Sequence, residues 1–251
     1  MMKNKVTAVY FSPTGGTKLA VQRFTKNFAE AELLDNTLLE QRNKQLAFGA
    51  DELVIVANPV YAGQIPHVPG LWQNLQGNNT PCVLLACYGN RHYDDTLAQM
   101  QRLLEQRGFK VIGAAAVIIP HIFSSVLGSE RPNAADEQIL ADFAAKISEK
   151  MQSAQYDKLQ LPGNPLPEIK APIAVPKALK EEQCNMCGAC VVLCPMQAID
   201  GTTLQSDETV CISCMRCVRY CRTGARSFDG SKIAAWLEAN FAQPRQIECF
   251  Y

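Results

Sequence analysis

Eight of the 11 cysteines in this 251-residue sequence lie between residues 184 and 221. They form two runs of equal spacing, and each run has three cysteines separated by two residues and a fourth after three more. Zinc sites usually pair two cysteines and then a second pair, whereas three thiolates at this spacing surround one corner of an iron–sulfur cubane. An alanine stands four residues after each run, at Ala198 and Ala225. The runs are Cys184, Cys187, Cys190 and Cys194, and Cys211, Cys214, Cys217 and Cys221.

The two runs resemble those of bacterial two-cluster ferredoxins, in which the fourth cysteine of each run binds the other cluster. The resemblance implies two [4Fe–4S] clusters. A zinc-bound or metal-free module is the alternative, and a disulfide framework is disfavoured because no secretory segment is expected. One departure from the family is Arg222, which follows the last cysteine where ferredoxins have proline. By this resemblance, one cluster is bound by Cys184, Cys187, Cys190 and Cys221, and the other by Cys211, Cys214, Cys217 and Cys194.

Arginines recur close to the second cysteine run. Ferredoxins of this kind are acidic, whereas residues 179–228 contain five acidic and five basic side chains. One hypothesis is that the arginines raise the reduction potential of a cluster or dock an acidic redox partner. A solvated helical face is an equally good interpretation. The arginines are Arg216, Arg219, Arg222 and Arg226.

A second candidate site follows the first predicted strand. Residues 12–18, Ser-Pro-Thr-Gly-Gly-Thr-Lys, place three hydroxyl groups and two glycines before a helical segment. In open α/β sheets, ligands bind beyond the carboxyl ends of the strands, where free N–H groups and the helix dipole favour an anion. The order of residues matches neither the nucleotide P-loop nor the GxGxxG fingerprint of dinucleotide sites. The segment therefore predicts a site for a single phosphate group, with an ordinary polar turn as the alternative.

Two other strand ends are expected at the same edge of the sheet. Residues 59–66 follow one strand and residues 88–94 follow the next, and both segments contain aromatic residues and glycine. Such loops suit a flat conjugated ring, although each tyrosine alone is nearly as compatible with ordinary packing. Together with the phosphate segment they resemble the flavodoxin family, whose members bind flavin mononucleotide (FMN) noncovalently. By this resemblance the phosphate is held by Ser12, Thr14, Gly15, Gly16 and Thr17, and the ring is flanked by Pro59, Val60, Tyr61, Ala62, Gly63, Tyr88, Gly89, Asn90, Arg91, Tyr93 and Asp94.

With both candidate sites in view, the sequence resembles the flavodoxin–ferredoxin fusion family of anaerobic bacteria over nearly its whole length. The resemblance implies a protein that passes electrons between two [4Fe–4S] clusters and FMN, and to or from a redox partner. This role needs no catalytic acid or base, because the protein fixes the orientation, burial and hydrogen bonding of its cofactors. A flavin-dependent reductase of a small-molecule acceptor, fed through the clusters, is the alternative. For that reaction residues 121–132 would form a lid or, failing that, a docking loop.

Hydrophobic patterning predicts the strands that position these segments. Nearly continuous apolar runs bounded by turn residues indicate buried strands at 5–11, 52–58, 82–88 and 111–120, with a weaker strand at 32–38. Strands that alternate with helices imply a doubly wound α/β domain. The resemblance implies a flavodoxin-like five-stranded parallel sheet, followed by a small α+β ferredoxin-like domain.

Apolar stripes and capping residues predict two of the helices. One is expected to begin at a cap on Asp94 and to end at Gly108. The other is expected to begin at the capping pair Asn133 and Asp136. Both helices would cover the sheet, because each carries apolar residues at helical spacing.

Proline marks the boundary between the two predicted domains. Five of the 14 prolines fall between residues 161 and 176. Proline fixes φ and lacks an N–H donor, so this segment is expected to be an extended, semi-rigid connector. We therefore predict a flavodoxin-like FMN-binding domain at 1–158, a linker at 159–177 and a ferredoxin-like domain with a C-terminal helix at 178–251.

Composition narrows the class of partner. The 24 lysines and arginines balance the 24 aspartates and glutamates, which argues against general attraction to nucleic acid or to an anionic membrane. No apolar run approaches the ~18 residues of a membrane span, and the apolar part of MMKNKVTAVYF is too short for a signal peptide. The expectation is a cytoplasmic protein with a redox protein as partner. Its oligomeric state stays open, and a homodimer is one alternative.

The remaining cysteines and the histidines show no ligand spacing. Cys82 and Cys87 lie on opposite faces of one predicted strand and are expected in the core. Cys249 has no predicted role. Three histidines near strand ends are expected to be solvated loop residues, and they are His67, His92 and His121.

Overall fold

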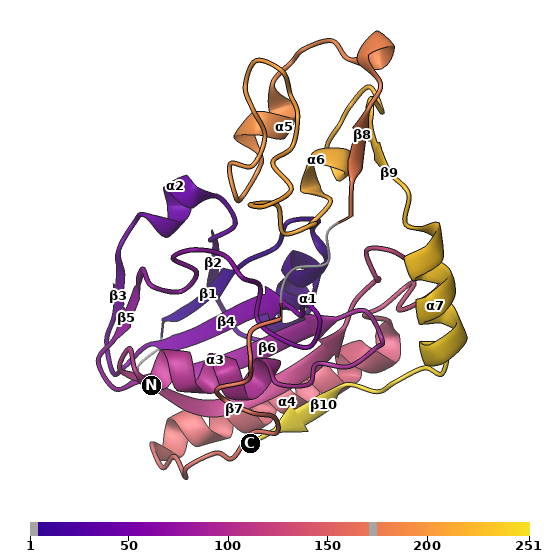
Figure 1. Cartoon of the computed structure of the whole chain (residues 1–251). Helices are drawn as coiled ribbons and strands as arrows, with labels where there is room; N and C mark the ends of the chain where they lie inside the picture. The colour runs from indigo at the N-terminus through magenta and orange to yellow at the C-terminus, as the bar shows by residue number, and fades with distance from the viewer. Residues whose placement is uncertain (1–4, 171–174) are drawn as a thin grey trace.

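The structure is a computed structural model that describes residues 5–170 and 175–251. Its larger part is built on one sheet, whose strands are β1 (Val6–Tyr10), β2 (Ala31–Asp35), β4 (Leu53–Pro59), β6 (Thr80–Tyr88), β7 (Phe109–Ile118) and β10 (Glu248–Phe250). The strand order is β10-β7-β6-β4-β1-β2 (Figure 1). All strands except β10 pair in parallel, in the flavodoxin-like order of doubly wound sheets. The predicted fold class and its five parallel strands are therefore confirmed.

Burial explains which strands were easy to predict. Every residue of β1 and of β6 is buried; α1 contacts both strands from one face of the sheet, and α3 contacts β6 from the other. Each residue of the edge strand β2 is half-buried or exposed. This incomplete burial accounts for the weaker apolar pattern at 32–38.

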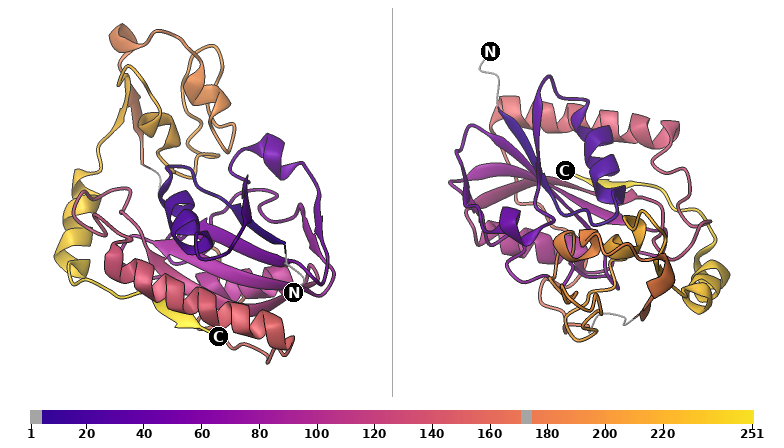
Figure 2. Two further views of the ribbon diagram at one scale, coloured as in Figure 1. Left: turned by 180° about the vertical axis from the view of Figure 1, so that it is seen from behind. Right: turned by 90° about the horizontal axis from the view of Figure 1, so that it is seen from above.

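Two helices pack on one face of the sheet and one packs on the other (Figure 2). α1 (Gly16–Thr25) and α4 (Ala134–Ser153) share a face, where the rings of Phe24 and Phe143 stack with their centroids 5.3 Å apart. α3 (Thr96–Glu105) lies on the opposite face. Helices thus cover the two faces of the sheet, and the predicted site residues lie at its carboxyl edge.

The helix caps agree with the sequence in one case and differ in the other. The predicted capping box at Asn133 and Asp136 is present at the start of α4. The predicted cap at Asp94 is wrong by one residue, because Asp95 is the N-cap of α3. Asp94 instead has a φ of +38°, and its carboxylate accepts a hydrogen bond from Arg91.

A short excursion from the sheet follows β2. It contains α2 (Leu39–Arg42) and β3 (Leu46–Phe48), and β3 pairs in parallel with β5 (Leu75–Gly77), which lies between β4 and β6 in the chain. In Figure 1, α2 lies at the upper left above the sheet, whereas β3 and β5 lie at the left beside it. α2 contacts the cysteine-rich part of the chain, because Arg42 Nη2 donates to the Pro195 carbonyl.

Residues 177–228 form the small domain. β8 (Lys177–Leu179) pairs antiparallel with β9 (Arg226–Phe228), and both cysteine runs lie between them, with η1 (Glu181–Gln183), α5 (Ala189–Val192) and α6 (Arg216–Arg219). The repeat seen in the sequence recurs in the backbone, because positive φ angles occur at equivalent places of the two runs. The matched pairs are Met186 with Ser213, Gly188 with Met215 and Gln197 with Gly224.

The end of the chain returns to the large sheet. α7 (Ser231–Phe241) leads to β10, which pairs antiparallel with β7 and sets Cys249 opposite Ala115. Partial burial raises the pKa of the Cys249 thiol to about 12, so Cys249 is a neutral, half-buried side chain at the sheet edge. We call residues 231–251 the C-terminal arm. Its last strand belongs to the sheet of the first domain, although the prediction assigned 178–251 to the second.

The linker is fastened to the surface of the large domain. Residues 155–170 form neither helix nor strand, as the proline content predicted. The Gln64 side chain donates to the Glu168 carbonyl (2.7 Å) and accepts from the Lys170 amide (3.2 Å). Residues 171–174, which the prediction also assigned to the linker, lie outside the described residues.

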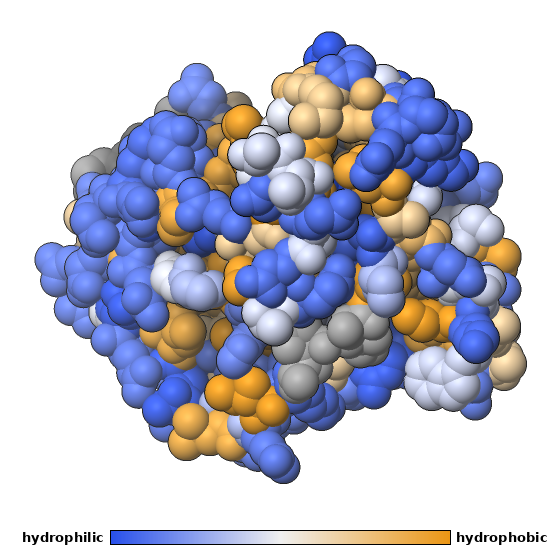
Figure 3. All heavy atoms as spheres, turned by 45° about the horizontal axis from the view of Figure 1, so that its top comes forward, coloured by the Kyte–Doolittle hydropathy of each residue, from blue (hydrophilic) through white to orange (hydrophobic). Residues whose placement is uncertain are grey.

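The surface is mixed in character. On the face shown in Figure 3, hydrophobic residues lie in separate patches among hydrophilic ones. In the described part of the chain, no helix has both the length and the apolar character needed to cross a membrane.

Candidate cofactor sites at the carboxyl edge of the sheet

Two glycines shape the segment between β1 and α1. Gly15 is the N-cap of α1 with a φ of +95°, a conformation that favours glycine. A Cβ on Gly16 would lie 2.9 Å from the Ile119 side chain, so this position also favours glycine. The N-cap Gly15 has no side chain that could accept a hydrogen bond from the first turn of α1. Apart from the Lys18 amide, which donates to Ser12 Oγ, the first turn therefore keeps N–H donors that suit an anion.

Two of the hydroxyl residues of the segment are buried, and one of them is hydrogen-bonded on both its backbone and its side chain. Ser12 and Thr17 are buried. The Ser12 amide donates to Thr37 Oγ1 (2.9 Å), and Ser12 Oγ accepts from the Lys18 amide (3.0 Å). These two hydrogen bonds connect Ser12 to Thr37 and to the first turn of α1.

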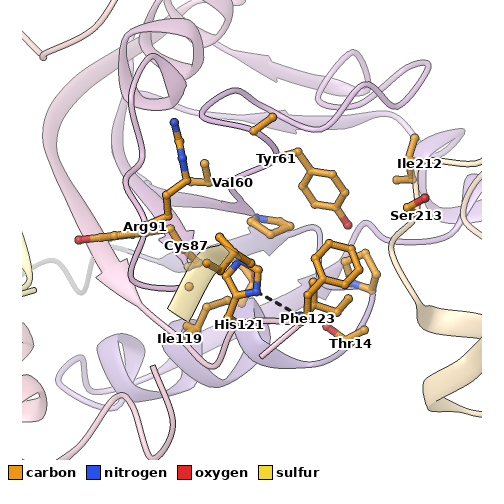
Figure 4. Close-up of a pocket in the computed structure, with 18 of the residues that line it drawn as sticks. Thr14, Val60, Tyr61, Cys87, Arg91, Ile119, His121, Phe123, Ile212 and Ser213 are labelled. Atoms are coloured by element: carbon orange, nitrogen blue, oxygen red, sulfur yellow. Dashed lines mark hydrogen bonds between the residues drawn. The ribbon is translucent and has the colours of Figure 1, made fainter. Parts of the chain in front are cut away.

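A cavity of about 580 Å³ opens at the carboxyl ends of the parallel strands (Figure 4). Its size is within the range of roughly 300–1,000 Å³ that is usual for small-molecule and cofactor pockets. The segments after β1, β4 and β6 meet around it, as the parallel topology requires. The predicted flavin contacts that line it are Ser12, Thr14, Thr17, Pro59, Val60, Tyr61, Ala62, Tyr88, Gly89 and Arg91.

Four other predicted contacts support this wall from behind or beside it. Gly15 and Gly16 lie between the lining residues Thr14 and Thr17. Gly63 has a φ of +85°, and a Cβ there would overlap the Asp94 carboxylate. Asp94 in turn accepts from the Arg91 guanidinium at 2.5 Å, so Asp94 positions a lining residue and does not itself line the cavity.

Asn90 and Tyr93 bind the C-terminal arm and do not line the cavity. Asn90 Nδ2 donates to the carbonyls of Phe241 (2.7 Å) and Gln243 (3.0 Å). The buried Tyr93 hydroxyl donates to the Glu248 carboxylate (2.8 Å). These contacts fix the arm beside the sheet, which local sequence patterns gave no means to foresee.

Two walls of the cavity were not predicted as flavin contacts. His121, Ile122 and Phe123 follow β7, in the segment proposed above as a lid. The other unpredicted wall is formed by α7, through Ile233, Trp236 and Leu237, which are distant in sequence from the strand ends. Lys170 of the linker also reaches the cavity, where its Nζ donates to the Ala62 carbonyl (3.1 Å).

His121 differs from the expected solvated histidine. Its ring lies in the cavity wall, and Nδ1 accepts from the Phe123 amide at 3.1 Å (Figure 4). Burial lowers the pKa of His121 to about 4, so the imidazole is neutral at physiological pH. The cavity therefore has a neutral polar group at this wall.

The small domain gathers four cysteines from both runs. Cys214 and Cys217 are buried. Burial first, and then the neighbouring thiolates of Cys194 and Cys211, raise the pKa of both, that of Cys214 to about 12. These four residues are the set that the ferredoxin resemblance implied for one cluster. Cys194 belongs to the first run and the other three to the second.

Backbone N–H groups point at sulfur in this set. The Ala198 amide donates to Cys194 Sγ (3.3 Å) and the Ser213 amide to Cys211 Sγ (3.4 Å). Such donors stabilise thiolates, which are the form that binds iron. A bound cluster would displace the thiol protons, so the donor set fits a [4Fe–4S] cluster.

The other predicted set lies farther out. Cys184 follows η1, at the end of the small domain away from the sheet (Figure 1), and Cys187 is exposed. Burial is the largest single effect on the Cys221 thiol and raises its pKa, but hydrogen bonds from the backbone and from Thr223 together outweigh it and lower the pKa. Within residues 5–170 and 175–251, no group of three or more His, Cys, Asp or Glu side chains is arranged to hold a single metal ion. The thiolates of a [4Fe–4S] cluster bind four different irons and need no such arrangement.

Tyr61 lies between the cavity and the inner cysteine set. It lines the cavity, and burial together with the thiolates of Cys214 and Cys211 raises the pKa of its hydroxyl. Ile212 and Ser213, which stand between these two cysteines in the sequence, also line the cavity (Figure 4). The two candidate sites therefore share a wall.

The four arginines of the small domain do not form one face. Arg216 and Arg226 are buried, and Arg226 donates to the Leu204 carbonyl and to Ser206 Oγ. Arg219 and Arg222 are exposed. Only the exposed pair is free to meet a partner protein.

Comparison with known families agrees with the cysteine geometry. Residues 179–200 and 204–227 match the family described as 4Fe-4S binding domain, and each matched stretch contains one cysteine run. Residues 179–227 form a 4Fe-4S binding domain. The chain thus joins a flavodoxin-like domain to an iron–sulfur domain, in the order that the resemblance to flavodoxin–ferredoxin fusions implied. No curated protein matches the sequence.

Solved structures similar to this chain include several flavodoxins. An archaeal flavodoxin is 14% identical with a TM-score of 0.39 and covers 59% of this chain and 99% of its own. The two-electron reduced flavodoxin of Megasphaera elsdenii is 18% identical with a TM-score of 0.38 (56% and 98% covered). The flavodoxin of Streptococcus pneumoniae TIGR4 is 14% identical with a TM-score of 0.39 (58% and 98% covered). The fold assignment rests on the strand order.

The burial of His121 predicts its titration. The ring should stay neutral down to a pH near 4, because the cavity wall disfavours its charged form. The unfolded chain takes up this proton near pH 6.5, so the folded state should lose stability as the pH falls from 6.5 to 4. An NMR titration of the histidine rings, with His121→Gln to assign the signal, measures this directly. A midpoint close to 6.5 would show that the ring is solvated.

Proposed function

We propose that this protein is an electron-transfer flavoprotein that binds FMN and two [4Fe–4S] clusters and exchanges electrons with a redox partner protein. When bound, the clusters exchange single electrons and the flavin accepts one or two. The observation that carries the proposal is the wall shared by the inner cysteine set and the cavity, at Tyr61, Ile212 and Ser213. This arrangement brings two redox sites together within one chain.

The residues of the chain have separate tasks in this function. The segment Ser12–Thr17 would hold the phosphate through backbone and hydroxyl donors. The loops at Tyr61 and Tyr88 would flank the ring, and α7 with Phe123 would keep water from it. Cys194, Cys211, Cys214 and Cys217 would hold the inner cluster, and Cys184, Cys187, Cys190 and Cys221 the outer one.

The outer end of the small domain is the proposed docking surface. Cys187 is exposed there, and so are Met186, which precedes it in the sequence, and Val192 of α5. Arg219 and Arg222 add positive charge near Cys221. A partner with an acidic surface would be attracted to these charges. We propose that the partner is a cytoplasmic redox protein with such an acidic surface.

Cofactor content tests the proposal most directly. Protein purified without oxygen should contain about eight irons, about eight sulfides and one FMN per chain. In Cys194→Ala the inner cluster should be lost although this cysteine belongs to the first run, so the remaining iron signal should be that of the outer cluster. Metal and flavin analysis with electron paramagnetic resonance measures both. Zinc without sulfide would overturn the iron–sulfur part of the proposal.

The phosphate segment can be tested by one nearly isosteric change. Thr17→Val removes a hydroxyl in the first turn of α1. The change should weaken FMN binding by roughly tenfold or more, because a hydrogen bond to a charged group usually contributes that much affinity. Thr7→Val is the matched control, because Thr7 is buried in β1 and its hydroxyl has no partner in the described structure. Fluorescence titration with FMN gives both affinities. Equal losses in the two variants would place the phosphate elsewhere.

The exposed arginines predict how the partner binds. Arg219→Gln together with Arg222→Gln should slow electron exchange with an acidic redox protein several-fold at low salt, and the difference should shrink at high salt. Stopped-flow rates with an acidic ferredoxin measure this, while unchanged reduction by dithionite is the control. Equal rates at all salt concentrations would remove the docking proposal. Saturable turnover of a small acceptor, sensitive to changes in residues 121–132, would favour a reductase instead.

A further inference from the structure

Two buried arginines cross the boundary between the domains in opposite directions. Arg42, the last residue of α2 in the large domain, donates from Nη2 to the Pro195 carbonyl of the small domain (2.6 Å). Arg216, the first residue of α6 in the small domain, donates from Nη1 to the Pro13 carbonyl of the large domain (2.7 Å). Arg42 is 5% exposed and Arg216 is 8% exposed. Each domain thus inserts one guanidinium into the other.

Both arginines act beside ligands of the same proposed cluster. Pro195 directly follows Cys194, and Arg216 directly precedes Cys217. Cys194 and Cys217 come from different cysteine runs, but both belong to the inner set. The two contacts therefore hold the inner set from two sides.

Both arginines are also connected by hydrogen bonds to Ser12 and Pro13 of the phosphate segment. Arg42 Nη1 donates to the Thr37 carbonyl, and Thr37 Oγ1 accepts from the Ser12 amide (2.9 Å). Arg216 donates to Pro13, the residue after Ser12, and more weakly to the Ser12 carbonyl (3.4 Å). Hydrogen bonds thus connect the residue after Cys194 and the residue before Cys217 to the same turn of chain.

The charges of the two side chains are not neutralised by the protein itself. In the described part of the chain, neither guanidinium forms an ion pair with a carboxylate. Their hydrogen-bond partners are carbonyl oxygens, and Arg216 also lies over the ring of Tyr220, 4.8 Å from its centroid. Burial lowers the pKa of Arg42, which reflects the cost of holding its charge away from water. Such a cost is offset when anions lie nearby. A flavin phosphate on one side and a cluster with four thiolates on the other would be two such anions.

We infer that Arg42 and Arg216 form a two-sided clamp that makes binding of the flavin phosphate depend on the inner cluster. The cluster fixes Cys194 and Cys217, these fix Pro195 and Arg216, and the clamp then orders Ser12 and Pro13 for the phosphate. Because coupling between sites is reciprocal, bound FMN stabilises the inner cluster to the same extent. The inference rests on the proposed function, since it takes both cofactor sites as given.

The test compares FMN affinity with and without clusters in the full chain. Clusters are removed from part of one preparation by an iron chelator, and FMN is titrated into both samples by fluorescence. Wild-type protein should bind FMN about tenfold more tightly, or better, when the clusters are present, within the 5- to 150-fold span usual for coupled sites. Arg216→Gln and Arg42→Gln should bring this ratio close to one. Arg219→Gln, on the same short helix but exposed, should keep the wild-type ratio.

Lysine variants and hydrogen exchange cover the case in which the glutamine variants do not fold. Arg216→Lys and Arg42→Lys keep the charge but lose the forked geometry, so their ratios should fall between those of wild type and glutamine. In wild-type protein without FMN, cluster removal should speed hydrogen exchange at the Ser12 and Lys18 amides. Exchange that does not change, or a ratio near one in wild type, overturns the clamp while leaving the two cofactors in place. A wild-type chain that takes up clusters but no FMN overturns the proposed function instead.

Discussion

Parallel pairing of buried strands is the constraint on which the rest of this structure depends. Since β1, β4, β6 and β7 run in one direction and are buried, their carboxyl ends and the segments that follow them collect at a single edge. The phosphate segment, the cavity and the contact with the small domain all lie at this edge. A second redox site can share a wall with the cavity only if its domain is held there, and the chain provides that hold.

The small domain is attached to the large one at both of its ends. On one side the linker is fastened to Gln64, and on the other the C-terminal arm pairs with β7 and is bound by Asn90 and Tyr93. A single flexible linker would only raise the effective concentration of one domain near the other. Two attachments and the buried contacts of Arg42 and Arg216 hold the inner cysteines in one position against the cavity. The small domain is therefore held in a fixed position and does not diffuse at the end of a flexible tether.

Much of this was predictable from the sequence because its signals are local. The cysteine runs, the glycines after β1 and the capping box of α4 each lie within a dozen residues, where spacing alone determines the chemistry. The wall that α7 forms was not predictable, because α7 is brought to the cavity only when β10 pairs with β7. Asn90 and Tyr93 were predicted as flavin contacts because the C-terminal arm, which they bind, is also distant in sequence. A polar or aromatic residue at a strand end has the same local pattern whether it meets a ligand or a distant arm.

The two cysteine sets differ in burial, although their spacing in the sequence is the same. Cys214 and Cys217 are buried, and Cys214 belongs to the hydrophobic core of the large domain, whereas Cys187 is exposed. The arginines follow the same division, with Arg216 and Arg226 buried beside the inner set and Arg219 and Arg222 exposed. Burial and nearby charge are the means by which a protein sets the potential of an iron–sulfur cluster. Two clusters in these sets would therefore have different potentials, and the difference arises from how one repeat packs against the sheet and not from the repeat itself.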